Sequence, residues 1–235
     1  MAGLLSQPLT LPEEFVLLSQ LDTGHVRDVA QTAVGCAAAE LGELALRRHL
    51  LVRANKSRKF GFEVYSYSAR RPGEISLLST EPIGIGWADA LLAELHQSAA
   101  GDQPLKLPRW LRHRGHAALA LHRAALADRG LLRHEPRTLW RRERHHTDRE
   151  TRNALLAEVR AAHQERVPLD ARLMFLCDLA EKAELMNDLG LTLTFREHLA
   201  RARAHARGTD PESQLPEDLR DTSVMLTTWI PSRKG

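Results

Sequence analysis

The segment from Val26 to Leu50 constrains the fold more than any other part of the chain, because it is apolar on nearly every side of a helix. Its apolar residues recur at steps of three and four, which is the spacing of successive helical turns. A helix that is hydrophobic all round is buried, and its many alanines allow neighbouring helices to approach closely. We therefore predict a central helix here, with Ala33, Ala37 and Leu41 buried.

The rest of the chain predicts further helices around this one. Thr10, Pro12 and the two glutamates after it have the order of a cap, a proline and an acidic first turn, which is typical of a helix start. Residues 208–222 have the composition of a linker, and the apolar segment "SVMLTTWI" at its end predicts a short C-terminal helix that docks on the core. Other helical patterns lie at residues 80–97, 105–129 (before Gly130), 148–165, 169–189 and 194–207.

Two regions have the composition of strands. Residues 51–78 contain short segments rich in β-branched or aromatic residues, separated by basic or Pro-Gly turns, which predict two or three strands. The segment "LLRHEPRTLW", residues 131–140, predicts two short strands around "HEPRT". The predicted fold is therefore mainly α: a single compact helical domain over residues 1–235, built around a buried central helix and carrying short β-hairpins.

Composition restricts the compartment. Cys36 and Cys177 are the two cysteines, and both lie inside apolar helical patterns, as expected of buried thiols in a reducing compartment. The N-terminal residues lack the features of a signal peptide, and no window approaches 18 apolar residues. We expect a cytoplasmic protein, with any membrane contact peripheral.

Basic residues are the strongest functional signal. The formal net charge is only +3, but Lys106, Arg109, Arg112, Arg114 and Arg123 follow one another with no acidic residue between them. Arginine keeps its charge when partly desolvated and pairs well with phosphate, which suits an anion-binding surface. With His116 on the same predicted helix, these arginines are the candidate anion site.

The second basic stretch, "RTLWRRERHH", mixes arginines with Leu139 and Trp140. A membrane surface would use the arginines for anionic headgroups and the Leu-Trp pair for the interfacial layer. A nucleic-acid site would use the same arginines with stacking aromatics, and an ordinary hairpin would pack Trp140 against its own domain. The candidate membrane-insertion residues are Arg137, Leu139, Trp140, Arg141 and Arg142.

Motifs for catalysis and metal binding are weak. CxxC, HExxH and GxSxG are absent, and the histidines sit among arginines without an evident set of ligands, so we expect no metal and no cofactor. Glu40 and Glu43 lie inside the most apolar helix, so at least one should be buried and paired, for example with Arg47. The stripe Asp178, Glu181, Glu184 and Asp188 would fit magnesium, but a solvated helix face explains it better.

Several blocks, in the same order, resemble the Golgi phosphoprotein 3-like (GPP34) family, in particular a bacterial member of actinobacterial type. The match begins at "LTLPEEFVLLSQLDTGHV", is sharpest in "VGCAAAELGELALRRHLLV", and continues through "STEPIGIGWADALLAEL", "ALADRGLLRHE", "TDRETRNALLAEVRAA" and "PLDARLMFLCDLAEKAELM". The resemblance implies a mostly α-helical domain around a central helix. It also implies phosphatidylinositol 4-phosphate binding and a hydrophobic hairpin that dips into the bilayer, because eukaryotic members have both and hold Golgi enzymes in place through their cytoplasmic tails.

The chain departs from the family at the headgroup pocket. Where eukaryotic members have a tryptophan before the central helix, this chain has His25, and where they have an arginine just before "GC" it has Val34. By an ungapped count, two further pocket arginines fall on His116 and Leu119. The block that reads P-T-G-D in the family is "PIGI" here. Binding of anionic lipid in general is therefore a better expectation than phosphoinositide specificity.

These observations favour a peripheral membrane protein, without catalysis, that binds anionic headgroups through the basic patch and the Leu-Trp hairpin tip. Two alternatives stay open: an enzyme of a bacterial biosynthetic pathway built on the same scaffold, and a protein-interaction adaptor. A protein partner or a homo-oligomer is compatible with the sequence, and nucleic acid is the less favoured ligand.

Overall fold

The computed structural model describes residues 8–53, 56–59, 62–65, 73–99, 105–138, 143–164, 168–191 and 211–232. Helices dominate these residues, and the strands form three separate antiparallel pairs. The predicted mainly α fold with short hairpins is confirmed. The helices are α1 (Leu11–Ser19), α2 (Val29–Leu46), α3 (Gly86–Ala99), α4 (Leu107–Asp128), α5 (Arg149–His163), α6 (Ala171–Lys182), α8 (Glu217–Thr227) and a 3-10 helix (Pro211–Gln214).

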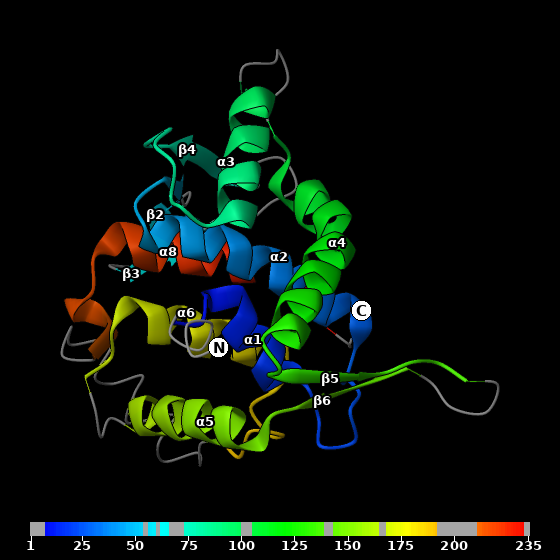
Figure 1. Ribbon diagram of the computed structural model, residues 1–235. Coiled ribbons are helices and arrows are strands. Elements are labelled where there is room, and N and C mark those ends of the chain that lie inside the picture. The colour runs from blue at the N-terminus through cyan, green and yellow to red at the C-terminus, as the bar shows by residue number, and fades with distance from the viewer. Residues whose placement is uncertain are drawn as a thin grey trace.

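The helix α2 is the centre of the fold, as the sequence predicted. Ala33, Ala37 and Leu41 are at most 1% exposed, and α2 packs against α1, α3, α4, α6 and α8 (Figure 1). Its first residues are held by Asp28, whose side chain accepts a hydrogen bond from the Gln31 backbone N–H. The predicted segment began three residues earlier, but Val26 pairs with Gln20 in an isolated β-bridge and Asp28 is the extended cap residue.

Small residues bring the neighbouring helices close to α2. A Cβ atom added to Gly35 would lie 2.5 Å from the ring of Phe15 in α1, and one added to Gly42 would lie 2.8 Å from Leu11. On another side, Gly115 of α4 meets the backbone of Ala33. Interiors are close-packed, so these contacts fix how α1 and α4 lie on the central helix.

The carboxylates of α2 are paired, as their buried positions require. Glu43 accepts a hydrogen bond from Arg47 at 2.7 Å, which is the partner expected from the sequence, and another from the Leu11 backbone N–H at 2.8 Å. Glu40, fully buried, is paired with Arg114 of α4. The charges inside this apolar helix therefore join it to α1 and α4.

The strands lie in three pairs: β1 (Leu50–Arg53) with β4 (Glu74–Leu77), β2 (Lys56–Lys59) with β3 (Phe62–Tyr65), and β5 (Leu132–Glu135) with β6 (Arg144–Thr147). The first strand predicted around "HEPRT" is present, whereas the second, predicted over Leu139 and Trp140, lies outside the described residues. The described partner strand runs from Arg144, and the backbone N–H of His145 donates to the carbonyl of Gly24 at 2.7 Å. This contact with the loop before α2 holds β6 in place.

The C-terminal helix docks on the core as predicted, but it begins at Glu217, inside the segment 208–222 that was expected to be a linker. Met225 and Leu226 of α8 are fully buried. The Thr222 hydroxyl accepts a hydrogen bond of 3.0 Å from the Val52 backbone N–H. The helix α6 ends at Lys182, earlier than predicted, since Glu184 takes a left-handed conformation with φ +55°. The helix expected at residues 194–207 lies outside the described residues.

The two cysteines are free, and Cys36 is buried in α2. Within the described part of the chain, no helix combines the length and the apolar character needed to cross a bilayer.

Candidate functional site

The basic residues predicted as one patch on α4 point into three different environments. Successive residues of a helix are turned by about 100°, so a run of arginines that is continuous in sequence is divided around the helix. Arg109 and Arg112 lie beside one cavity, Arg114 faces α2, and Arg123 lies in a separate cleft with Arg137. His116 is on the exposed surface of α4.

Arg114 belongs to a buried polar network. Its guanidinium donates two hydrogen bonds, of 2.8 and 2.9 Å, to the carboxylate of Glu40. The Nε2 atom of His122, which is also fully buried, lies 3.1 Å from the same carboxylate, and the ring of Trp87 packs edge-on against His122. Burial alone would raise the pKa of Glu40, but the hydrogen bonds from His122 and Arg114 outweigh it and lower that pKa. The charge of Arg114 is thus matched within the fold.

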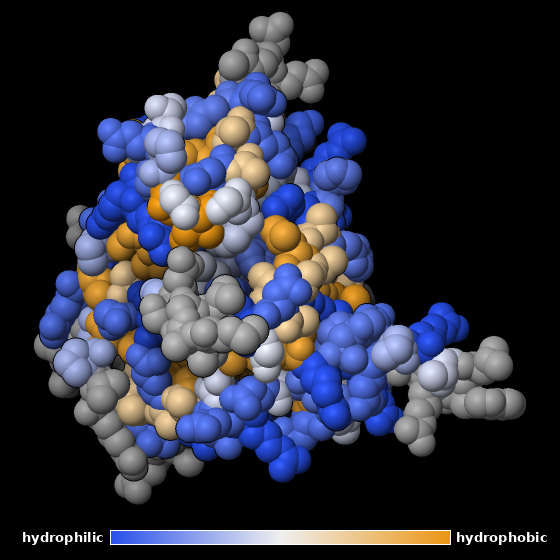
Figure 2. All heavy atoms as spheres, viewed as in Figure 1, coloured by the Kyte–Doolittle hydropathy of each residue, from blue (hydrophilic) through white to orange (hydrophobic). Residues whose placement is uncertain are grey.

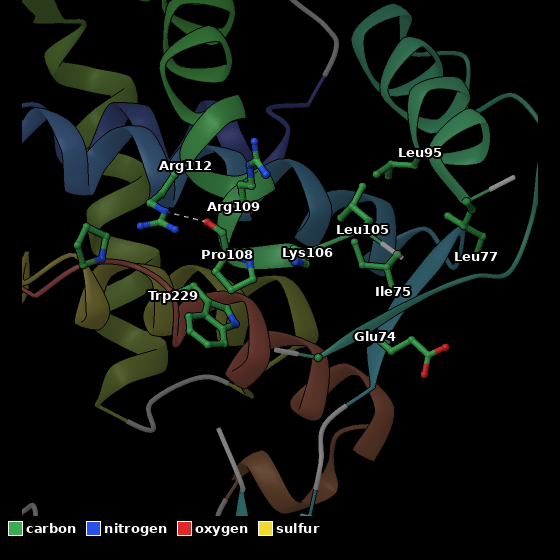
Figure 3. A pocket seen from close by; sticks show the side chains of 13 residues that line it. Glu74, Ile75, Leu77, Leu95, Leu105, Lys106, Pro108, Arg109, Arg112 and Trp229 are labelled. Carbon is green, nitrogen blue, oxygen red and sulfur yellow. Dashed lines mark hydrogen bonds between the residues drawn. The ribbon is translucent and has the colours of Figure 1, made fainter. Parts of the chain in front are cut away.

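Arg109 and Arg112 line a cavity of about 830 Å³, which we call the apolar cavity. In Figure 3, Ile75, Leu95 and Leu105 gather on one side of it, and Trp229 lies on another. Arg112 is held in part by a hydrogen bond from its Nε to the Pro108 carbonyl. The residues that line the apolar cavity are Gly73, Glu74, Ile75, Leu77, Leu95, Ala99, Leu105, Lys106, Pro108, Arg109, Arg112, Trp229 and Pro231.

Arg123 and Arg137 line a smaller cleft of about 470 Å³, the hairpin cleft, which is bordered by the start of α2, by α4 and by residues of the hairpin β5–β6. The Nε atom of Arg123 is buried and has no hydrogen-bond partner among the described residues. An unpaired buried donor is unfavourable unless a ligand or water satisfies it. The lining residues are Gly24, His25, Val26, Val29, Arg123, Arg137, Glu143 and His145.

Two groups in the hairpin cleft have shifted pKa values. Burial lowers the pKa of Arg123, although an arginine remains cationic at neutral pH. Burial, with a further contribution from the charge of Arg123, lowers the pKa of His145 to about 4, so its imidazole is neutral at pH 7. The cleft also contains the carboxylate of Glu143, whose Oε1 atom lies 3.0 Å from Nε2 of His134 and 3.3 Å from Nε2 of His145. The cleft therefore combines two arginine charges with a carboxylate that already has partners.

Next to this cleft, the hairpin β5–β6 projects from the helical body beside the C-terminal end of α4 (Figure 1). Figure 2 shows hydrophilic residues gathered where the hairpin leaves the body. Val29, at the edge of the cleft, is an exception, being 53% exposed. Arg137 is exposed, whereas the other predicted insertion residues, Leu139, Trp140, Arg141 and Arg142, lie outside the described residues.

The carboxylate stripe considered for magnesium is divided among separate partners. Asp178 accepts a hydrogen bond from Ser223, and Glu184 accepts one from Ser232. Asp188 pairs with Arg27, and Glu181 lies 3.6 Å from the Lys182 ammonium. Because α6 ends at Lys182, Glu184 and Asp188 are not on the helix face that the sequence implied.

His25 was not among the predicted site residues, although it stands where the family's headgroup pocket has a tryptophan. The structure places His25 in the hairpin cleft with Arg123. The position is therefore in a cleft even though its residue type differs. Val34 and Leu119, at two of the other counted pocket positions, are buried in the core.

Comparison with known proteins gives one assignment. No curated protein matches the chain. The family model described as Golgi phosphoprotein 3 (GPP34) matches residues 11–225 of the 235. The match runs from the start of α1 into α8, and so includes the central helix, the hairpin, the hairpin cleft and most of the lining of the apolar cavity. The chain belongs to the Golgi phosphoprotein 3 (GPP34) family.

Proposed function

We propose that this protein is a peripheral membrane protein that binds anionic lipid headgroups in the hairpin cleft, while the tip of β5–β6 contacts the bilayer. The observation that carries the proposal is the guanidinium of Arg123, which is partly buried in the cleft with its Nε unpaired. Phosphate oxygens are the acceptors that arginine binds best. Family membership supports the same ligand class, since phosphoinositide binding is known in the GPP34 family.

Other features of the cleft suit a phosphate. Arg137 adds a second cation, and the cleft includes Val29, the first residue of the 18-residue helix α2. The N-terminus of a helix carries a partial positive charge that favours anions, although the Asp28 carboxylate already accepts the Gln31 N–H there. Glu143 opposes an anion, but its single negative charge is outnumbered by the charges of Arg123 and Arg137 in the same cleft. The balance of charge at the cleft is therefore favourable for a phosphate group.

The bilayer contact is proposed from the sequence of the hairpin. Leu139 and Trp140 are flanked by Arg137, Arg141 and Arg142, an order that suits an interfacial layer with headgroups around it. Burying each of the two apolar side chains would contribute about 1.5–3 kcal/mol. Each arginine near an anionic surface would add about 1 kcal/mol. Together, these burial and electrostatic energies are enough to attach the protein reversibly to a membrane but not to anchor it permanently.

Vesicle co-sedimentation tests the headgroup site. Arg123→Glu is compared with Arg149→Glu, which changes the net charge equally at an exposed position of α5 outside the cleft. On vesicles containing phosphatidylserine or phosphatidylinositol 4-phosphate, Arg123→Glu should weaken binding about 30-fold, because a charge reversal removes about twice the 1 kcal/mol of one arginine. Arg149→Glu should bind nearly as the wild type does. Equal binding by both variants would reject the hairpin cleft as the headgroup site.

The same vesicle experiment tests the other residues of the anion site predicted on α4. Arg109 and Arg112 are retained as a second basic site, because they are not paired with a carboxylate in the described structure. Arg114, which is bonded to Glu40, and the exposed His116 complete the predicted set. A double variant, Arg109→Glu with Arg112→Glu, that loses more vesicle binding than Arg123→Glu would move the headgroup site to the apolar cavity.

A second candidate function rests on the apolar cavity. Its walls are largely aliphatic or aromatic, whereas Lys106, Arg109 and Arg112 supply three cations at one end. Small-molecule sites combine such apolar walls with a few polar groups, so an amphipathic anion such as a fatty acid would fit. Dodecanoate should raise the melting temperature of the wild type. It should raise that of Arg109→Ala less. An equal shift in both proteins would exclude this cavity as its site.

A further inference from the structure

Three potential metal ligands converge on one face of the hairpin β5–β6. His134 and His145 are directly opposite each other on the two strands, and their rings stack with centroids 4.8 Å apart. Glu143 precedes His145 by two residues, and side chains at that spacing point to the same side of an extended chain. The hairpin thus brings together residues from both strands that are separated in the sequence.

The two distances between the Glu143 carboxylate and the histidine nitrogens are close to those between neighbouring ligand atoms around a small metal ion. The Glu143 Oε1 atom lies 3.0 Å from Nε2 of His134 and 3.3 Å from Nε2 of His145. One ligand atom from each residue lies within 4.8 Å of the other two. Tetrahedral Zn²⁺, with bonds of about 2.0–2.2 Å, holds neighbouring ligand atoms roughly 3.3–3.5 Å apart. Small side-chain adjustments would therefore close the three ligands around one ion.

We propose that the hairpin binds one divalent transition-metal ion of the Zn²⁺ class through His134, Glu143 and His145. Two imidazoles and one carboxylate form a ligand set that zinc uses where a fourth position stays open. Imidazole nitrogens favour zinc and its neighbours in the transition series over Mg²⁺ or Ca²⁺, which prefer oxygen. From the sequence we expected no metal, since no third ligand was apparent near the histidine pairs.

The surroundings prepare these ligands for a metal. The backbone of His145 is fixed by its hydrogen bond to Gly24, while His134 and Glu143 are 45% and 54% exposed and free to adjust. The main opposing term is the positive charge of Arg123, which lines the same cleft as Glu143 and His145.

The position of the site also gives the ion a neighbouring anion pocket. Glu143 and His145 border the hairpin cleft, so an ion held between them would lie at its edge. A divalent ion would neutralise the carboxylate that otherwise opposes an anion there, leaving a local positive charge beside Arg123 and Arg137. The metal site itself does not depend on lipid binding and can be tested without any membrane.

Isothermal titration of Zn²⁺ into the metal-free full chain, in buffer without lipid or phosphate, tests the proposal. The wild type should bind one ion per chain. His134→Ala and Glu143→Gln should each weaken that binding at least about tenfold, because a lost ligand matters no less than a lost outer-shell contact. Since both side chains are about half exposed, the variants should fold normally, which circular dichroism checks.

His113→Ala is the matched control, since it also removes one exposed histidine but lies on α4 away from the hairpin. It should bind Zn²⁺ as the wild type does. Absence of binding to the wild type at equimolar concentration, or unchanged affinity in both hairpin variants, would overturn the proposal. Vesicle binding that fails while Zn²⁺ binding holds would reject the proposed lipid function and leave the metal site standing.

Discussion

Gly115 of α4 lies against the backbone of Ala33 in α2, so closely that a Cβ atom on Gly115 would be 2.8 Å from the Ala33 carbonyl carbon and 2.9 Å from its oxygen. Real Cβ atoms essentially never come so near backbone atoms. Because the neighbour is backbone rather than the end of a flexible side chain, a side chain at this position must push the two helices apart. Gly115 therefore sets the distance between α4 and the central helix.

Gly115→Ala should accordingly lower the free energy of unfolding by about 1–3 kcal/mol, the usual effect of overpacking a core. Urea denaturation measures the change. Gly86→Ala is the control, because a Cβ atom there meets nothing within 4 Å. It should leave stability unchanged or raise it slightly, as alanine favours helix over glycine. If Gly115→Ala is as stable as the wild type, α4 can move away from α2 with little loss of stability.

Glu40→Ala should destabilise the protein by about 3–5 kcal/mol, since it leaves the buried groups of Arg114 and His122 without their carboxylate. Glu150→Ala, at an exposed position in the first turn of α5, should change the free energy of unfolding by less than about 0.5 kcal/mol. Thermal or chemical denaturation compares the two. A loss in Glu40→Ala no larger than in the control would show that the network contributes nothing to stability.

Glu14 should make stability depend on pH. Burial raises its pKa from 4.5 to about 7, although Arg172 partly opposes the shift. Between those two values the folded protein binds a proton that the unfolded chain does not, so the free energy of unfolding falls as pH rises through this range. The contribution amounts to at most about 1.4 kcal/mol per pH unit.

In Glu14→Gln this contribution is lost. The difference in melting temperature between variant and wild type should therefore shift in favour of the variant as the pH is raised from 5 to 8. Glu150→Gln, at an exposed carboxylate, should show a constant difference over the same range. A constant difference for Glu14→Gln as well would mean that Glu14 is ionised throughout.

The double variant Leu139→Ala with Trp140→Ala should weaken vesicle binding at least about a hundredfold, given the burial energy of two apolar side chains. Its melting temperature should be almost unchanged. Leu78→Ala, which removes another exposed leucine, 51% exposed, should retain vesicle binding. A large fall in the melting temperature of the double variant would show instead that Trp140 packs into the core.

Local pattern was sufficient to predict the central helix, because a segment without a polar face has to be buried and Ala33, Ala37 and Leu41 recur with helical spacing. It was not sufficient for the hairpin. Leu139 and Trp140, predicted to be in its second strand, lie outside the described residues, whereas β6 is described from Arg144 and its His145 backbone N–H donates to the Gly24 carbonyl. Such a contact between distant segments leaves no local signal.

The same limit applies to the site. The arginines of α4 form one run in the sequence, yet Arg114 is bonded to Glu40, a residue of another helix. A count of charges could not reveal that pairing. His134 and His145 likewise meet only because their strands pair in one particular register. Residue types alone could not group these residues into a site, because that grouping depends on tertiary contacts.

The docking of α8 also has a consequence for how the chain folds during its synthesis. The hydroxyl of Thr222 pairs with the Val52 backbone, and Met225 and Leu226 complete the core beside α2. A nascent chain that has emerged only as far as α6 leaves this side of the central helix open to solvent. Contacts between such distant segments form slowly, and exposed apolar surface favours aggregation. Folding should therefore be completed only when α8 has left the ribosome, and until then the exposed side of α2 would be prone to aggregation.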